Sequence, residues 1–221
     1  MKRLLLLTIL ISFFSITKAQ YAETSTKTKV TTLDPKLDVN YHTHKGFYLS
    51  TSLGIVGGSI NSEIPNAIKS KYSGTGMNFD IKLGGAIKEN LILHATIISS
   101  AVAGPTIKVG NAPNVDAPSD FTIAEAMIGA GLTYYIMPEN IFISGSLGIG
   151  QFTVADDNDS ATTDKGFSMQ LKVGKEWWVS TNWGLGISAS YMKTNLKNSL
   201  GDINEDIDSN RFALSFNVTF N

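Results

Sequence analysis

The chain has 221 residues, of which 43% are hydrophobic and 17% charged, a composition typical of a folded domain rather than of a disordered chain. Its formal net charge of −1 leaves no excess of Lys and Arg to neutralise a phosphate backbone, so we expect no nucleic-acid partner. Because the chain has no Cys, disulfides, thiolate metal sites and a lipid-bearing cysteine are excluded.

The N-terminus has the pattern of a secretion signal. Lys2 and Arg3 precede an apolar run from Leu4 to Phe14, and a polar stretch then ends at the small residue Ala19. This order predicts a signal peptide over residues 1–19, with an uncleaved N-terminal anchor as the alternative. No later stretch reaches about 18 consecutive apolar residues, so any membrane crossing by the mature chain would have to use strands.

Residues 20–45 predict a flexible periplasmic arm. They are mostly Thr, Lys, Asp and Ser with Pro35, and they show neither a helical nor a strand period. His42 and His44 lie at alternate positions near the end of this arm. Two imidazoles without a third ligand would hold a metal weakly, so we expect both to be solvated and no metal site to form.

After Gly46 the sequence is typical of an all-β meander. Segments of about a dozen residues, rich in Gly, Ser, aromatic and β-branched residues, alternate with polar turn-forming residues. The pattern predicts eight strands, over residues 46–60, 73–87, 91–103, 121–136, 141–154, 166–180, 183–195 and 209–220.

The expected connections alternate in length. Three are tight, at residues 88–90, 137–140 and 181–182, and four are long, at residues 61–72, 104–120, 155–165 and 196–208. In an antiparallel meander this order collects the tight turns at one rim and the long loops at the other. Outer-membrane barrels have this asymmetry, with short periplasmic turns, long outer loops and an even number of strands.

The last expected strand alternates most clearly. Its apolar face would carry Phe212, Leu214, Phe216, Val218 and Phe220, and its polar face Arg211, Ala213, Ser215, Asn217 and Thr219. Alternation alone fits either a soluble lipocalin-like barrel with an apolar cavity or a membrane barrel with a polar lumen. The polar faces favour the membrane barrel, because their acidic and basic residues balance and are interleaved with small residues, as a narrow lumen requires.

We therefore predict a polar network inside the barrel, formed by Asp80, Lys82, His94, Glu125, Lys172, Glu176 and Arg211. Because an unpaired buried charge is costly, these side chains are expected to form one connected network that stabilises the barrel more than it conducts. Lys175 is the exception, since alternation directs it at lipid, where a cation at the midplane costs about 2–4 kcal/mol. A bulge, or snorkelling of the ammonium toward the rim, would relieve this cost.

Aromatic residues gather near the two expected rims. Amphipathic rings prefer the headgroup level of a bilayer, so residues beside the tight turns are predicted to be interface aromatics. They are Trp177, Trp178, Trp183, Tyr134 and Phe220.

The chain resembles the small outer-membrane β-barrel family, a porin-family class typified by the OmpA transmembrane domain and OmpX. The features that carry the resemblance are the signal peptide, the eight segments, the loop asymmetry and the ending Arg211 to Asn221. The resemblance covers residues 46–221. It implies an eight-stranded antiparallel up-and-down transmembrane β-barrel in the outer membrane of a Gram-negative-type cell. The implied partners are outer-membrane lipid and lipopolysaccharide, the barrel-assembly machinery, which reads a terminal aromatic residue such as Phe220, and an envelope protein.

The candidate catalytic residues do not assemble into a hydrolase in this scheme. A hydrolase at the outer mouth needs a His beside its nucleophile, whereas His94 is expected in the periplasmic half, away from Ser99 and Ser100 near the outer rim.

Two groups of acidic residues lie in the expected long loops, and neither has the EF-hand pattern. The first is Asp156, Asp157 and Asp159, and the second is Asp202, Glu205, Asp206 and Asp208. We expect solvated loops there, with divalent bridging to lipopolysaccharide as the alternative.

The functional prediction is a non-enzymatic barrel with a structural or interaction role in the cell envelope and no cofactor. The alternatives are a narrow channel or minor porin, an outer-membrane barrel hydrolase and a soluble lipocalin-like ligand carrier.

Overall fold

The computed structural model describes residues 42–65, 69–157, 159–200 and 203–221. Three short strands, β4 (Thr106–Val109), β5 (Val115–Asp116) and β8 (Ser160–Thr162), lie in the connections between long ones. The predicted signal peptide and arm residues 20–41 lie outside the described residues. The long strands are β1 (Phe47–Glu63), β2 (Lys69–Lys88), β3 (Leu91–Ala103), β6 (Thr122–Ile136), β7 (Ile141–Ala155), β9 (Gly166–Trp178), β10 (Trp183–Leu200) and β11 (Ile203–Phe220).

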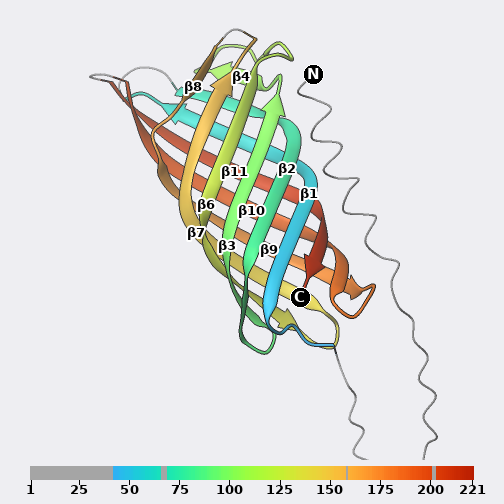
Figure 1. Cartoon of the computed structure of the whole chain (residues 1–221). Helices are drawn as coiled ribbons and strands as arrows, with labels where there is room; N and C mark the ends of the chain where they lie inside the picture. Colours follow the sequence, from blue (N-terminus) through green and yellow to red (C-terminus); the bar gives the residue numbers. More distant parts are fainter. Residues whose placement is uncertain (1–41, 66–68, 158, 201–202) are drawn as a thin grey trace, which may run out of the picture. The chain divides into compact units, whose positions relative to one another are not determined.

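The long strands close into an antiparallel barrel. Each one pairs with its neighbour in the chain, and β1 pairs with both β2 and β11, so the sheet has no open edge between its first and last long strands. Leu49 lies opposite Phe220 on one side and opposite Leu83 on the other. Figure 1 shows the start of β1 and the C-terminus at the same end of the barrel. The predicted eight-stranded fold is confirmed.

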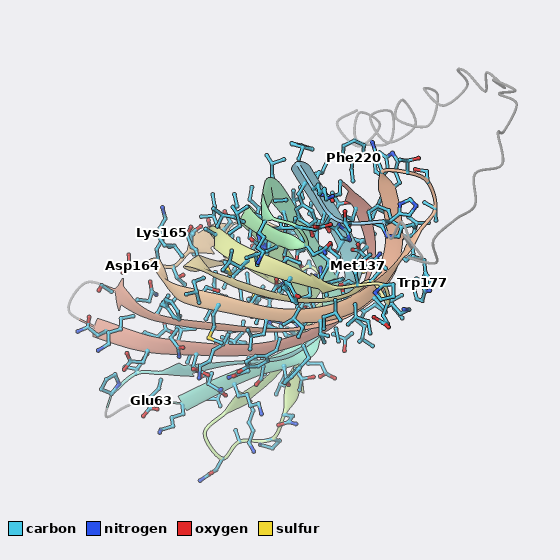
Figure 2. All side chains as sticks on the ribbon, turned by 90° about the horizontal axis from the view of Figure 1, so that it is seen from below. Glu63, Met137, Asp164, Lys165, Trp177 and Phe220 are labelled. Atoms are coloured by element: carbon cyan, nitrogen blue, oxygen red, sulfur yellow. The ribbon has the colours of Figure 1, made fainter. Side chains whose placement is uncertain are left out.

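Tight turns and long connections lie at opposite ends, as predicted. Figure 2 shows one end of the barrel with Met137, Trp177 and Phe220 and the other with Glu63, Asp164 and Lys165. We call these the turn end and the outer end.

Two of the four predicted long loops are mostly strand. β1 and β2 continue to the pair Glu63 and Lys69, and β10 and β11 continue to the pair Leu200 and Ile203. Residues 61–72 and 196–208 were expected as long loops. Backbone pairing nevertheless continues there, and cross-strand charges such as Glu63 with Lys69 and Asp206 with Lys197 lie next to each other.

The barrel carries its apolar residues outside and its polar residues inside. In β11, Phe212, Leu214 and Phe216 are 65%, 72% and 52% exposed, whereas Arg211, Ser215, Asn217 and Thr219 are buried. A soluble barrel would have the opposite arrangement, because water would contact the polar face. The lipocalin-like alternative is therefore wrong, and the exterior has the character of a lipid-facing surface.

This apolar exterior continues around the barrel, on every long strand. The exposed apolar residues of the other strands include Leu53, Ile55, Met77, Phe79, Leu83, Leu93, Ile97, Ile128, Leu132, Ile143, Leu147, Ile149, Leu171, Val173 and Ile187.

Among the residues that the structure describes, no helix is long and apolar enough to cross a membrane.

Leu214→Ala tests whether this surface contacts lipid. The substitution should lower the free energy of unfolding by about 2 kcal/mol, because it removes three carbon groups from an apolar environment at about 0.8 kcal/mol each. Val115→Ala in β5, an exposed apolar residue of the outer connections, should change it by less than about 0.5 kcal/mol. Urea unfolding of the barrel in lipid vesicles measures both, and equal small effects would contradict a lipid-facing Leu214.

Candidate functional site

All seven predicted network residues lie buried inside the barrel. Period-two alternation directs their side chains inward from β2, β3, β6, β9 and β11. Three carboxylates and three cations share the lumen with one imidazole, so its formal charges cancel. The residues are Asp80, Lys82, His94, Glu125, Lys172, Glu176 and Arg211.

Two buried ion pairs cross the lumen. Lys172 Nζ lies 3.3 Å from Asp80 Oδ2, and Gln170 Nε2 donates to the same oxygen at 3.2 Å. Arg211 Nε lies 3.2 Å from Glu125 Oε2, which also accepts a hydrogen bond from Ser209 at 2.8 Å. Each pair joins strands far apart in the chain, so it stabilises the closed barrel rather than one hairpin.

The other predicted residues bond to hydroxyl groups. Lys82 Nζ donates to Ser144 Oγ at 2.7 Å, and Ser144 also accepts a hydrogen bond from Thr133. Glu176 accepts hydrogen bonds from Thr219 at 2.7 Å and from Tyr135 at 3.3 Å. Direct hydrogen bonds and ion pairs therefore join these side chains within four groups rather than in one chain of contacts. Lys82 also lies close enough to Asp80, Lys172 and Glu176 for their charges to interact, so the groups are coupled electrostatically.

His94 is held by threonine hydroxyls. Its Nδ1 and Nε2 atoms lie 2.9 Å from Thr96 Oγ1 and 3.0 Å from Thr133 Oγ1. The ring fits because its cross-strand neighbour Gly131 has no side chain, since an added Cβ there would lie 2.8 Å from His94 Cε1. Both ring nitrogens therefore contact threonine hydroxyls that are themselves buried inside the lumen.

An aromatic cluster, which we call the turn-end plug, fills the lumen at the turn end. Tyr48, Ile92, Tyr135 and Phe142 are buried together, and the hydroxyls of Tyr48 and Tyr135 lie 3.1 Å apart. His44 covers this cluster, with its ring stacked on Tyr135 at a centroid distance of 3.5 Å. The plug therefore combines side chains of β1, β3, β6 and β7 with one from the segment before β1.

The expectation that His44 is solvated was wrong. The residue is 1% exposed, and its Nε2 lies 2.9 Å from Asn140 Oδ1, while its backbone N donates to Asn90 Oδ1. Burial lowers the pKa of His44 to about 4, although the hydrogen bond to Asn140 partly offsets this effect. The end of the predicted arm therefore docks on the barrel, because the plug offers an aromatic face and two turn amides.

Four of the five predicted interface aromatics lie at the exterior of the turn end. Tyr134, Trp177 and Trp183 are exposed, and Phe220 packs beside Trp183 with ring centroids 5.1 Å apart. Trp178 is the exception, because its side chain is half-buried. Its ring lies 4.8 Å from that of His44, and the indole nitrogen is buried.

Lys175 snorkels, which was one of the two expected solutions. Its ammonium donates to the backbone oxygen of Glu139 at 2.5 Å, and it lies 5.7 Å from the centre of the Trp177 ring. The charge thus reaches the rim while the stem stays on the apolar exterior.

The feature that the sequence analysis missed is a cavity of about 250 Å³ inside the outer end, which we call the outer-end cavity. Four buried apolar side chains line it, namely Ile60, Ile123, Phe152 and Ile207. Continuing the inward face of each strand past the polar lumen would have indicated these positions. One of them, Ile207, fell within an expected loop, so that face was not continued.

A carboxylate with hydrogen-bond partners lies in the wall of this cavity. Glu205 accepts a hydrogen bond from Asn198 Nδ2 at 3.0 Å and another from Ser62 Oγ, and all three residues line the cavity. It is the single charged residue in the lining of this cavity, within the part of the chain that the structure describes.

Acidic residues of the outer end lie beside lysines. Among the described side chains, no group of three or more His, Asp and Glu residues could hold a metal ion. Asp206 and Asp208 instead lie near Lys197 and Lys193, at 3.9 and 3.4 Å. Asp202 lies outside the described residues.

Comparisons with known proteins identify the fold. No protein-family model matches the sequence, and no curated protein matches it. Neisserial surface protein A superposes with a TM-score of 0.51 at 15% identity, covering 79% of this chain and 96% of that one. The outer membrane protein OprG from Pseudomonas aeruginosa also gives 0.51 at 15% identity, covering 81% and 99%.

The closed antiparallel barrel, its apolar exterior and these two superpositions define the class. The chain has the fold of the small eight-stranded outer-membrane β-barrels. Within that class it has a polar lumen, a turn-end plug and an apolar outer-end cavity.

Proposed function

We propose that the protein is an integral outer-membrane barrel with a structural or interaction role, without enzymatic activity and without an open pore. The turn-end plug is the single observation that carries this proposal. Tyr48, Ile92, Tyr135 and Phe142 fill the lumen cross-section, and His44 lies over them. An eight-stranded barrel is just wide enough for side chains to fill it, so such a cluster leaves no continuous water path.

The outer end supports the interaction role. The β1–β2 and β10–β11 hairpins extend through residues 61–63, 69–71, 195–200 and 203–208, which carry charged and amide side chains on their exposed positions. Paired charges such as Lys69 with Glu63 keep these hairpins ordered beyond the apolar exterior. A rigid polar projection of this kind can contact lipopolysaccharide or an envelope protein.

The contacts of the described histidines support the absence of catalysis. His94 bonds to two threonine hydroxyls, His44 bonds to asparagine, and the His42 ring lies 5.1 Å from that of Trp178, so none of the three described rings is hydrogen-bonded to a serine hydroxyl. Ser100 is buried opposite Glu125 rather than beside an imidazole.

Conductance in planar lipid bilayers tests the closed lumen. The folded protein should give no single-channel current above background, whereas Tyr135→Ala with Phe142→Ala should open small steady currents by removing the plug. Steady currents through the unmodified protein, with an ion selectivity that changes in Lys82→Gln or Lys172→Gln, would instead establish a narrow channel. Retarded gel mobility after boiling shows that each preparation contains folded barrel.

A further inference from the structure

The outer-end cavity is closed toward the lumen. Below it, within the described residues, lies a void of about 10 Å³, lined in part by Ile60, Ile123 and Arg211. That is about the room that a single water needs. The Arg211–Glu125 ion pair lies on this side, so the cavity is a pocket that opens at the outer end and does not continue into the lumen.

The connection between β7 and β9 completes the side wall of the cavity. Ala161 and Thr162 of β8 and the neighbouring Thr163 line it. Asp164 then ties this segment to β10, because its backbone N donates to Asn198 Oδ1 at 3.0 Å and its carboxylate accepts from Ser199 N at 2.9 Å. The wall is thus fixed by hydrogen bonds rather than by one continuous sheet.

The charge of Glu205 is not neutralised within the described structure. Its two oxygens accept hydrogen bonds from neutral donors, Ser62 and Asn198, and no described Lys or Arg lies within ion-pair distance of it. A carboxylate can accept about four hydrogen bonds, so it retains capacity for another donor. A half-buried carboxylate on an apolar wall favours a cation as its partner.

We propose that the outer-end cavity binds a compact molecule with an apolar body and a protonated amine, the body against Ile123, Phe152 and Ile207 and the amine on Glu205. The volume fits this class, since an apolar cavity of about 150 Å³ holds benzene and this one measures about 250 Å³. The site goes beyond the proposed function, because it requires neither a closed nor an open lumen.

The test uses three fluorinated probes of one shape, 4-(trifluoromethyl)benzylamine, the corresponding benzyl alcohol and the corresponding benzoate. Fluorine NMR titrations of the full-length barrel in lipid nanodiscs, with protein-free nanodiscs as the blank, measure the affinities. The amine should bind about tenfold more tightly than the alcohol, as expected for a charge-assisted hydrogen bond, and the benzoate should not bind. Equal affinity for amine and alcohol, or no protein-dependent binding, would overturn the proposal.

Variants locate the binding. Glu205→Gln should remove the preference for the amine while the affinity for the alcohol stays within about twofold. Ala161→Trp should abolish binding of both probes by filling the cavity. Ser160→Trp, one residue earlier and outside the lining, is the matched control and should leave binding unchanged. Binding that survives Ala161→Trp would place the probes elsewhere, whatever the conductance experiment shows.

Discussion

Replacing Asp80 by asparagine is expected to lower the free energy of unfolding by roughly 3–5 kcal/mol, the cost of leaving a buried charge without its partner. Lys172 would keep its hydrogen bond to Ser52 at 2.6 Å but would lose the carboxylate 3.3 Å away. Lys82, buried two positions along β2 from Asp80, would also lose a neighbouring negative charge. Urea titration of the barrel in lipid vesicles, followed by tryptophan fluorescence, measures the loss.

The double variant Asp80→Asn with Lys172→Met separates the ion pair from a general effect of substitution. Removing both charges should restore more than half of the stability that Asp80→Asn alone loses, because no unpaired ammonium then remains at position 172. A loss below about 1 kcal/mol for the single variant, or an additive loss in the double variant, would contradict the structural role of this pair.

His44 should make the stability depend on pH between about 6.5 and 4. Burial lowers its folded-state pKa to about 4, so the folded protein holds the ring neutral while the unfolded chain takes up a proton below about 6.5. The unfolded state then binds more protons in this window, and stability falls as the pH falls through it, by roughly 3 kcal/mol in total. Above pH 7 the ring is neutral in both states and contributes no slope.

His44→Gln isolates this contribution from the carboxylates that titrate in the same range. The glutamine can donate to Asn140 but cannot take up a proton, so the difference in stability between the two proteins should shrink as the pH falls from 7 to 4. His42→Gln is the matched control. The two aromatic residues that contact the His44 ring, Tyr135 and Trp178, are unchanged in all three proteins. NMR titration should give a His44 pKa near 4, and a value near 6.5 would mean that the segment is not docked.

The strands and their faces could be predicted because their signals are local. Alternation in β11 fixes that Arg211 and Leu214 point to opposite sides, and the short connections at residues 137–140 and 181–182 fix antiparallel neighbours. The identities of the buried lumen residues followed from this alternation. The partners of these residues could not be predicted, because a contact such as that of Lys172 with Asp80 depends on the stagger with which the barrel closes.

Sequence alone thus determines an eight-stranded meander with one apolar and one polar face, since both properties repeat every two residues along a strand. The balanced charges and small residues of the polar faces also favoured the polar set inside, and the closed sheet confirms this arrangement. Tertiary structure alone decided the docking of His44 and the outer-end cavity. Each combines side chains from segments that are distant in the chain. These side chains come together through the curvature of the closed barrel, which no local pattern specifies.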